Sequence, residues 1–197
     1  TYAIVGSVRL YKRQYINSIF LYMEHMPYLD RLWFGEYFKY EKSPEYWLTD
    51  VSGIPFGMMS EMLQDGGNPY RGMLYGMTAR EPMESVPSQV WKVWDAFGIK
   101  DSRMMGYWVS YNPVKTGRND ILATSFVKDG KVMIAIASWA KKDSDIKLQI
   151  DWEKLGIDAD KARLTAPDIK GFQEGFSLSP KDKIKVPKDK GFIFILE

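Results

Sequence analysis

The most constraining feature of this sequence is a pair of β-rich runs joined by a turn that is typical of a tight hairpin. Residues 121–127 and 131–137 are rich in apolar and β-branched side chains, and Lys128, Asp129 and Gly130 lie between them. Asp-Gly supplies the positive φ angles that a two-residue hairpin turn needs. The pattern therefore predicts an antiparallel hairpin in the second half of the chain.

The rest of the second half continues as short apolar runs separated by turn residues. Apolar and polar residues alternate between Ile146 and Trp152, which predicts a strand with one buried face and one solvent-exposed face. Further strands are expected over residues 162–165, 172–178, 184–186 and 192–196. Such closely spaced turn signals, roughly every 8 to 12 residues, are typical of a small antiparallel β-sandwich. We therefore predict an all-β domain over residues 116–197.

The first half, residues 1–115, mixes helical patterns with short strand-like runs. Helices are expected over residues 16–23 and 90–97 and around Met58, Met59, Met62 and Leu63, and strands over residues 3–8, 31–34 and 73–75. Alternating strands and helices favour an α/β arrangement with a parallel sheet. About three strands are too few for a closed eight-stranded barrel, which needs roughly 250 residues.

Composition excludes several classes of function. The net charge of +2, from 27 basic and 25 acidic residues, is too balanced for a nucleic-acid binder. The chain has no cysteine, which excludes disulfides and thiolate chemistry, and its one histidine, His25, argues against a catalytic triad or a histidine-rich metal site. No apolar run is long enough to span a membrane. We expect no metal and no cofactor.

Aromatic residues make up 15% of the chain, with 7 Trp and 12 Tyr. Their flat apolar faces and polar edges complement the C–H faces and hydroxyl rims of sugars. Each of these rings is equally suited to packing in a core. The aromatic content therefore allows a carbohydrate as partner without requiring one.

Glu36 is the first candidate catalytic residue. It follows a strand-like run between Trp33 and Tyr37, and α/β barrels carry their active-site groups at the ends of strands. Carboxylates act as acid, base or nucleophile in glycosidic chemistry, and apolar neighbours would raise the pKa of Glu36 and suit it to the acid role. The alternative is a surface glutamate in a turn, or one paired with Arg31.

Asp50 is the second candidate catalytic residue. It follows Trp47 and precedes Gly53 and Gly57, which permit a close approach of the backbone. The alternative is that Asp50 or Ser52 caps a helix.

A third segment, residues 66–80, is rich in glycine but lacks the spacing of a phosphate-binding loop. Arg71 and Arg80 could hold a substrate by bidentate bonds, or could lock neighbouring loops together. The predicted substrate-binding residues are Trp33, Tyr37, Trp47, Arg71 and Tyr75.

Several segments together resemble bacterial proteins related to glycoside hydrolase family 123, many of them from gut Bacteroidota. The segments are YMEHMPYLDRLWFGE at 22–36, VSGIPFG at 51–57, YRGMLYGMT at 70–78, VWKVWDAFGI at 90–99 and AIASW at 135–139. Members of such families carry a (β/α)₈ barrel followed by a C-terminal β-sandwich. The resemblance implies that residues 1–115 are the last segments of a TIM-type barrel and that residues 116–197 are the sandwich.

The resemblance also implies a carbohydrate substrate, a periplasmic or extracellular location, and either self-association or association with a missing N-terminal barrel part. Family 123 enzymes are β-N-acetylgalactosaminidases that use the acetamido group of the substrate as nucleophile, assisted by an adjacent Asp-Glu pair. The sequence has no such dipeptide, so a catalytic pair would lie upstream, and Glu36 would be a pocket residue or an alternative acid. Related sequences often carry Glu at the position of Asp50. The alternative function is a non-catalytic carbohydrate-binding or scaffold domain.

Overall fold

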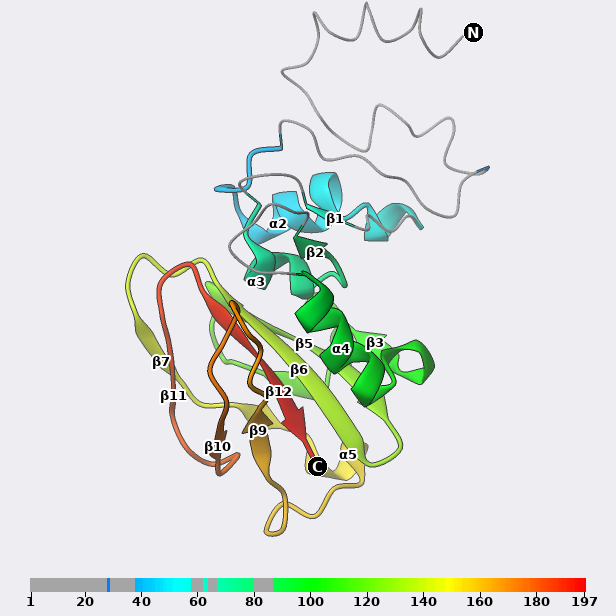
Figure 1. The fold of residues 1–197 in the computed structure, drawn as a ribbon, viewed down its shortest axis with the longest axis vertical. Helices are drawn as coiled ribbons and strands as arrows, with labels where there is room; N and C mark the ends of the chain where they lie inside the picture. Colours follow the sequence, from blue (N-terminus) through cyan, green and yellow to red (C-terminus); the bar gives the residue numbers. More distant parts are fainter. Residues whose placement is uncertain (1–27, 29–37, 58–61, 64–66, 80–86) are drawn as a thin grey trace, which may run out of the picture.

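A computed structural model describes residues 28, 38–57, 62–63, 67–79 and 87–197 of the chain (Figure 1). Its centre is a six-stranded antiparallel sheet in the order β10-β9-β12-β6-β5-β3. The strands are β3 (Arg103–Met105), β5 (Ile121–Lys128), β6 (Lys131–Ser138), β9 (Leu164–Ala166), β10 (Phe176–Leu178) and β12 (Gly191–Leu196). The edge strand β3 begins before residue 116.

The predicted hairpin is confirmed. Strands β5 and β6 pair over their full length, and Lys128 lies opposite Lys131. Only Asp129 and Gly130 remain for the turn, and their φ angles are 26° and 75°. Positive φ at both positions matches the twist of a two-residue turn to the twist of the strands.

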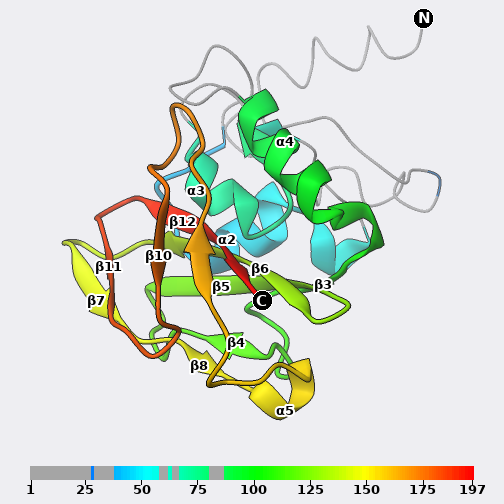
Figure 2. The same cartoon turned by 60° about the horizontal axis from the view of Figure 1, so that its bottom comes forward.

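Both faces of the six-stranded sheet are buried, which explains why its central strands read as nearly continuous apolar runs. In β6, successive side chains alternate between two cores: Val132, Ile134 and Ile136 on one face, and Met133, Ala135 and Ala137 on the other. Figure 2 shows the sheet between two layers, one of short strands and one of helices.

The layer of short strands consists of two antiparallel pairs. Strand β4 (Val114–Lys115) pairs with β8 (Gln149–Ile150), and β7 (Ser144–Ile146) pairs with β11 (Ile184–Val186). Their apolar side chains share the core that contains Val132 and Ile134. The predicted antiparallel β architecture of the second half is thus confirmed.

Two strand predictions in this half were wrong in detail. Residues 146–152 do not form one strand, because Trp152 begins the short helix α5 (Trp152–Leu155). The side chain of Asp151 caps that helix by accepting from the backbone N–H of Lys154 (3.1 Å), which favours a helical turn over an extended chain. The run 172–178 contains strand only from Phe176 to Leu178.

The opposite face of the sheet is covered by the helical layer. Its longest helix is α4 (Pro87–Phe97), and Gly98 follows it in the left-handed conformation (φ 79°). Proline at the start and glycine just past the end are the usual boundaries of a helix. The predicted helix over residues 90–97 is therefore confirmed.

Beside α4 lies a short β-α-β unit. Strand β1 (Met62–Leu63) pairs in parallel with β2 (Thr78–Ala79), and helix α3 (Pro69–Met73) connects them. The helix predicted around Met62 and Leu63 was wrong at those two residues. The strand predicted over residues 73–75 was also wrong, because Asn68 caps α3 by accepting from the N–H of Arg71 (3.0 Å) and Pro69 supplies the first helical position.

Shorter elements complete this layer: α2 (Pro44–Tyr46), the π-helix η4 (Trp47–Val51), and the 3₁₀ turns η5 (Ile54–Phe56) and η6 (Ile99–Asp101). The expected helix over 16–23 and strands over 3–8 and 31–34 lie outside the described residues. In the described part, no helix has the length and apolarity that crossing a bilayer requires.

Candidate functional site

Four of the seven predicted site residues lie in the helical layer. Trp47 and Asp50 are on η4, Arg71 is on α3, and Tyr75 is in the turn after α3. Trp33, Glu36 and Tyr37 lie outside the described residues. The structure brings Trp47, Arg71 and Tyr75 into one cluster.

The ring of Tyr75 is the centre of this aromatic cluster. It lies nearly parallel to Trp47 (centroids 6.0 Å apart, 14°) and to Trp108 (5.6 Å, 9°). Its hydroxyl lies 3.0 Å from that of Tyr107, which donates to the carbonyl oxygen of Pro44 (3.0 Å). Burial raises the pKa of Tyr107 to about 12 and that of Tyr75 well above its ordinary value. Both phenols therefore stay neutral at physiological pH.

Neither Trp47 nor Tyr75 presents a ring face to solvent, because both are fully buried. The indole Nε1 of Trp47 donates to the carbonyl oxygen of Tyr40 (3.1 Å), so its polar edge is also used inside the protein. In this arrangement the two rings form the core of the helical layer, and a sugar could not stack on them.

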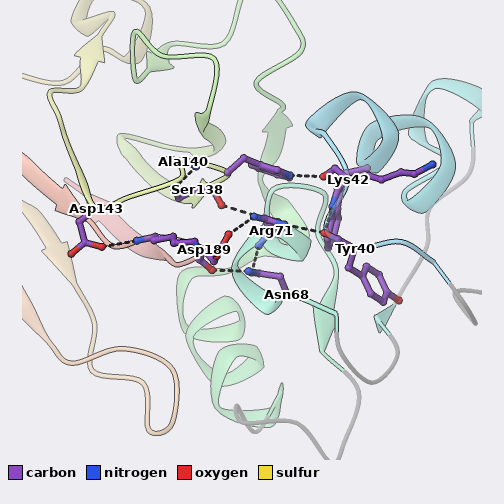
Figure 3. A network of polar contacts seen from close by, with 11 residues as sticks. Tyr40, Lys42, Asn68, Arg71, Ser138, Ala140, Asp143 and Asp189 are labelled. Carbon is purple, nitrogen blue, oxygen red and sulfur yellow. Dashed lines mark hydrogen bonds and ion pairs between the residues drawn. The ribbon is translucent and has the colours of Figure 1, made fainter.

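Arg71 fastens three parts of the chain together (Figure 3). Its Nε donates to the carbonyl oxygen of Ser138 (3.2 Å), its Nη1 to that of Tyr40 (2.9 Å), and its Nη2 to Oδ1 of Asp189 (2.7 Å). Its guanidinium also lies 4.7 Å from the ring centroid of Trp139. With four contacts and only 6% exposure, this geometry is that of an arginine that locks neighbouring loops.

Two further hydrogen bonds connect the helical layer to the segments that Arg71 binds. The amide of Asn68 donates to the carbonyl oxygen of Asp189 (2.6 Å), and Nε1 of Trp139 donates to that of Lys42 (2.8 Å). Asp189 has a positive φ of 55°, which is uncommon outside glycine and is tolerated best by Asn and Asp. Burial lowers the pKa of Arg71 while the Asp189 carboxylate opposes that shift. The guanidinium stays charged because its ordinary pKa is so high.

Asp50 is half-buried and accepts a hydrogen bond from the hydroxyl of Thr49 (2.9 Å). It lies in the π-helix η4, and π-helical turns are rare and frequent at functional sites. Ser52 donates to the carbonyl oxygen of Leu48 (2.6 Å). Of the two predicted catalytic residues, only Asp50 lies among the described residues, and its side chain is partly exposed to solvent.

A cavity of about 550 Å³ opens between α2 and the loop that precedes β5. It crosses from the helical layer to the pair β4–β8. The lining residues are Pro44, Glu45, Tyr107, Asn112, Val114, Lys115, Thr116, Gly117, Arg118, Asn119, Leu122, Ala123 and Gln149.

The loop that forms one wall of this cavity is held by its own side chains. The hydroxyl of Thr116 donates to the carbonyl oxygen of Ile121 and accepts from the N–H of Arg118 (3.3 Å). Arg118 binds the carboxylate of Asp120 through two bonds of 2.7 and 2.8 Å. Gly117 has φ 70°, and a Cβ there would lie 2.9 Å from the side-chain nitrogen of Gln149.

Asn112 fixes the floor of the cavity. It is buried, its amide donates to the carbonyl oxygen of Ala123 (2.9 Å), and its oxygen accepts from the N–H of Val114 (3.2 Å) and the hydroxyl of Ser125 (2.8 Å). A buried amide with all these partners is costly to move. The wall and floor are therefore formed before any ligand arrives.

Glu45 is the one carboxylate among the described residues that line the cavity. A hydrogen bond from the hydroxyl of Ser43 lowers its pKa, so the group is ionised at neutral pH. Hydrolysis of a glycosidic bond ordinarily needs two carboxylates that flank the bond. The cavity therefore suits binding better than hydrolysis. No group of three or more His, Cys, Asp and Glu side chains within the described ranges could hold a metal ion.

Comparison with protein families assigns the two halves of the chain. Residues 5–82 match the model of the glycoside hydrolase 123 TIM-barrel domain, and residues 86–197 match that of the glycoside hydrolase 123 C-terminal domain. The chain belongs to the glycoside hydrolase 123 family. The resemblance seen in the sequence is thereby confirmed at the level of the family. A search of curated proteins found no match.

Within this glycoside hydrolase 123 chain, the cavity spans both matched domains. Pro44 and Glu45 lie in the barrel match, and the loop from Asn112 to Asn119 lies in the C-terminal match. These residues could not be predicted from the sequence, because the loop carries no catalytic motif. The adjacent rings of Tyr107 and Trp108, followed by turn residues, were the one available signal.

Proposed function

We propose that this chain is the C-terminal part of a glycoside hydrolase whose complete form hydrolyses O-glycosidic bonds. The observation that carries the proposal is the order of the two matches, barrel domain first and C-terminal domain second, across nearly the whole chain. Residues 5–82 are too few to close an eight-stranded barrel, which needs roughly 250 residues. The parallel unit β1-α3-β2 is the kind of element from which such barrels are built.

In this proposal the chain supplies the last barrel segments and one side of a sugar pocket. Asp50 on η4 and Glu36 are its candidate carboxylates. The cluster of Trp47, Arg71 and Tyr75 supports the pocket from within the core. The Asp-Glu pair that the family resemblance implies would come from barrel segments upstream of Thr1.

The test is hydrolysis of chromogenic N-acetylhexosaminides and galactosides by this chain and by a version extended upstream to the length of a barrel. We expect turnover from the extended version only. Absence of turnover from both would contradict the proposal. In the active version, Glu36→Gln and Asp50→Asn should each lower kcat, by about 100-fold or more for a group that transfers a proton. Glu41→Gln, an exposed glutamate in the turn before α2, is the matched control.

A second candidate function is a scaffold without catalysis, which the full burial of Trp47 and Tyr75 favours. A scaffold would dock on the rest of the barrel through the apolar surface that a partial barrel leaves uncovered. We therefore propose that the chain alone self-associates and that the extended version does not. Size-exclusion chromatography with light scattering distinguishes the two states, and a monomeric chain would contradict this candidate.

A further inference from the structure

The cavity between α2 and the loop before β5 has polar groups without a partner. The side chains of Lys115, Asn119 and Gln149 are exposed. Within the part of the chain that the structure describes, none of the three has a hydrogen-bond or ion-pair partner. Lys115 lies directly opposite Gln149 in the pair β4–β8. Because Cβ atoms of opposed residues lie about 5 Å apart, one ligand can contact both side chains.

The walls that carry these groups are rigid. The hydroxyl of Thr116 bonds within the loop, and the buried amide of Asn112 fixes the floor. Gly117 supplies the positive φ of 70° that the loop needs at this point, a backbone conformation that other residues adopt with strain. Binding to a preformed site avoids the entropy cost of ordering a loop.

The charges in the cavity select the class of ligand. Arg118 also lines the cavity, but its guanidinium is already paired with Asp120. Of the remaining charges, the carboxylate of Glu45 would oppose an anionic ligand, and the ammonium of Lys115 would oppose a cationic one. A neutral ligand rich in hydroxyl groups satisfies both, since each hydroxyl can donate to the carboxylate and accept from the ammonium. The half-buried ring of Tyr107 adds an aromatic surface of the kind on which pyranose C–H groups pack.

We infer that this cavity binds a neutral saccharide, held by Glu45, Lys115, Asn119 and Gln149 beside the ring of Tyr107. The inference rests on the proposed function for the class of ligand and adds the place where the C-terminal domain contacts it. The cavity lies where the two matched domains meet, so a saccharide bound there would touch both.

The test is direct binding, measured by isothermal titration calorimetry and saturation-transfer NMR on the full chain. The probes are neutral oligosaccharides of β-linked galactose, glucose and N-acetylhexosamine, with an oligomer of uronic acid as the anionic probe. We expect at least one neutral probe to bind, and the uronic acid oligomer to bind more weakly. In Lys115→Ala/Gln149→Ala, the Kd for the neutral probe should rise about tenfold, as the loss of two hydrogen-bonding groups implies.

The matched control is Gln89→Ala/Lys92→Ala, which removes the same residue types from the apolar groove between α4 and the β5–β6 turn. Its Kd should be unchanged. Asn119→Ala, which removes a side chain without a partner, should raise the Kd about fivefold and replaces the double variant if that variant does not fold.

The inference is overturned if no neutral probe binds, if the cavity variants bind as the parent does, or if the control variant loses as much affinity as the cavity variants. Tighter binding of the uronic acid oligomer than of every neutral probe would also overturn it. Binding is measured independently of hydrolysis, so the saccharide site and the proposed hydrolase function can be refuted independently of each other. Loss of affinity in the cavity variants supports this site even where no version hydrolyses a glycoside. Turnover without binding at the cavity refutes this site alone.

Discussion

Replacing Arg71 with alanine should destabilise the chain strongly, because Arg71 makes buried contacts with three separate segments. The change removes hydrogen bonds to the carbonyl oxygens of Ser138 and Tyr40, an ion pair with Asp189, and the contact with the ring of Trp139. The buried carbonyl of Ser138 loses its donor, which costs about 1–3 kcal/mol, whereas the carbonyl of Tyr40 keeps the bond from Trp47, so its loss is that of one net hydrogen bond, about 1 kcal/mol. The ion pair contributes less, because Asp189 is half exposed and water screens it. We expect the free energy of unfolding to fall by about 3–5 kcal/mol.

The assay is urea unfolding followed by tryptophan fluorescence, with linear extrapolation to zero denaturant. Arg71→Lys keeps the charge but loses the planar fork, so it should recover only part of the stability. Arg118→Ala is the matched control, since Arg118 also pairs with a carboxylate but at the surface, and its midpoint should not move. An Arg71→Ala variant within about 1 kcal/mol of the parent would refute the reasoning, because one net hydrogen bond alone contributes that much.

Three other predictions concern the core. Tyr75→Phe removes the hydroxyl beside Tyr107 and should lower the free energy of unfolding by about 1–2 kcal/mol in the same urea assay. Burial raises the pKa of Tyr107 to about 12, whereas a free tyrosine has a pKa of about 10, so the neutral phenol contributes fully to stability below about pH 10 and this contribution is lost as the pH rises through about 12. Tyrosine absorbance and urea unfolding curves at alkaline pH should show this loss. Ionisation of every tyrosine near pH 10 in the folded chain would contradict the prediction. Gly191→Ala should prevent folding, because the added Cβ would meet the carbonyl group of Ile136 in the paired strand. In Gly130→Ala the added Cβ has no neighbour within 4 Å, so this variant should fold with a modest loss of stability. Circular dichroism distinguishes a folded from an unfolded variant.

The sequence predicted correctly those helices and strands that are determined by residues within or next to them. The turn of Asp129 and Gly130 predicted the β5–β6 hairpin, and the apolar stripe of α4 predicted that helix. The errors arose where a local signal was overlooked. The Asn68-Pro69 start of α3 explains why residues 73–75 are not a strand, and the cap from Asp151 explains α5.

The role of Arg71 could be predicted only as one of two alternatives, either binding a substrate or locking neighbouring loops together. Its partners Tyr40, Ser138 and Asp189 lie 31 to 118 positions away in the chain. Nothing in the sequence near Arg71 indicates which loops come together around it. The cavity was missed for the same reason, since Glu45 and Gln149 meet only through the tertiary fold. Whether Glu36 and Asp50 act on a glycosidic bond stays a prediction.

The two matched domains share one core, so neither is complete without the other. Trp47 and Tyr75 from the barrel match belong to the same apolar cluster as Phe126 and Ile193 from the C-terminal match. Without the helical layer, strands β5, β6 and β12 would expose a continuous apolar face, which soluble proteins avoid. The sheet therefore needs the helical layer to cover it, and the helical layer needs the sheet as a base on which to pack. Arg71 lies at that shared boundary, which is why a single buried cation there is bonded to segments from both domains.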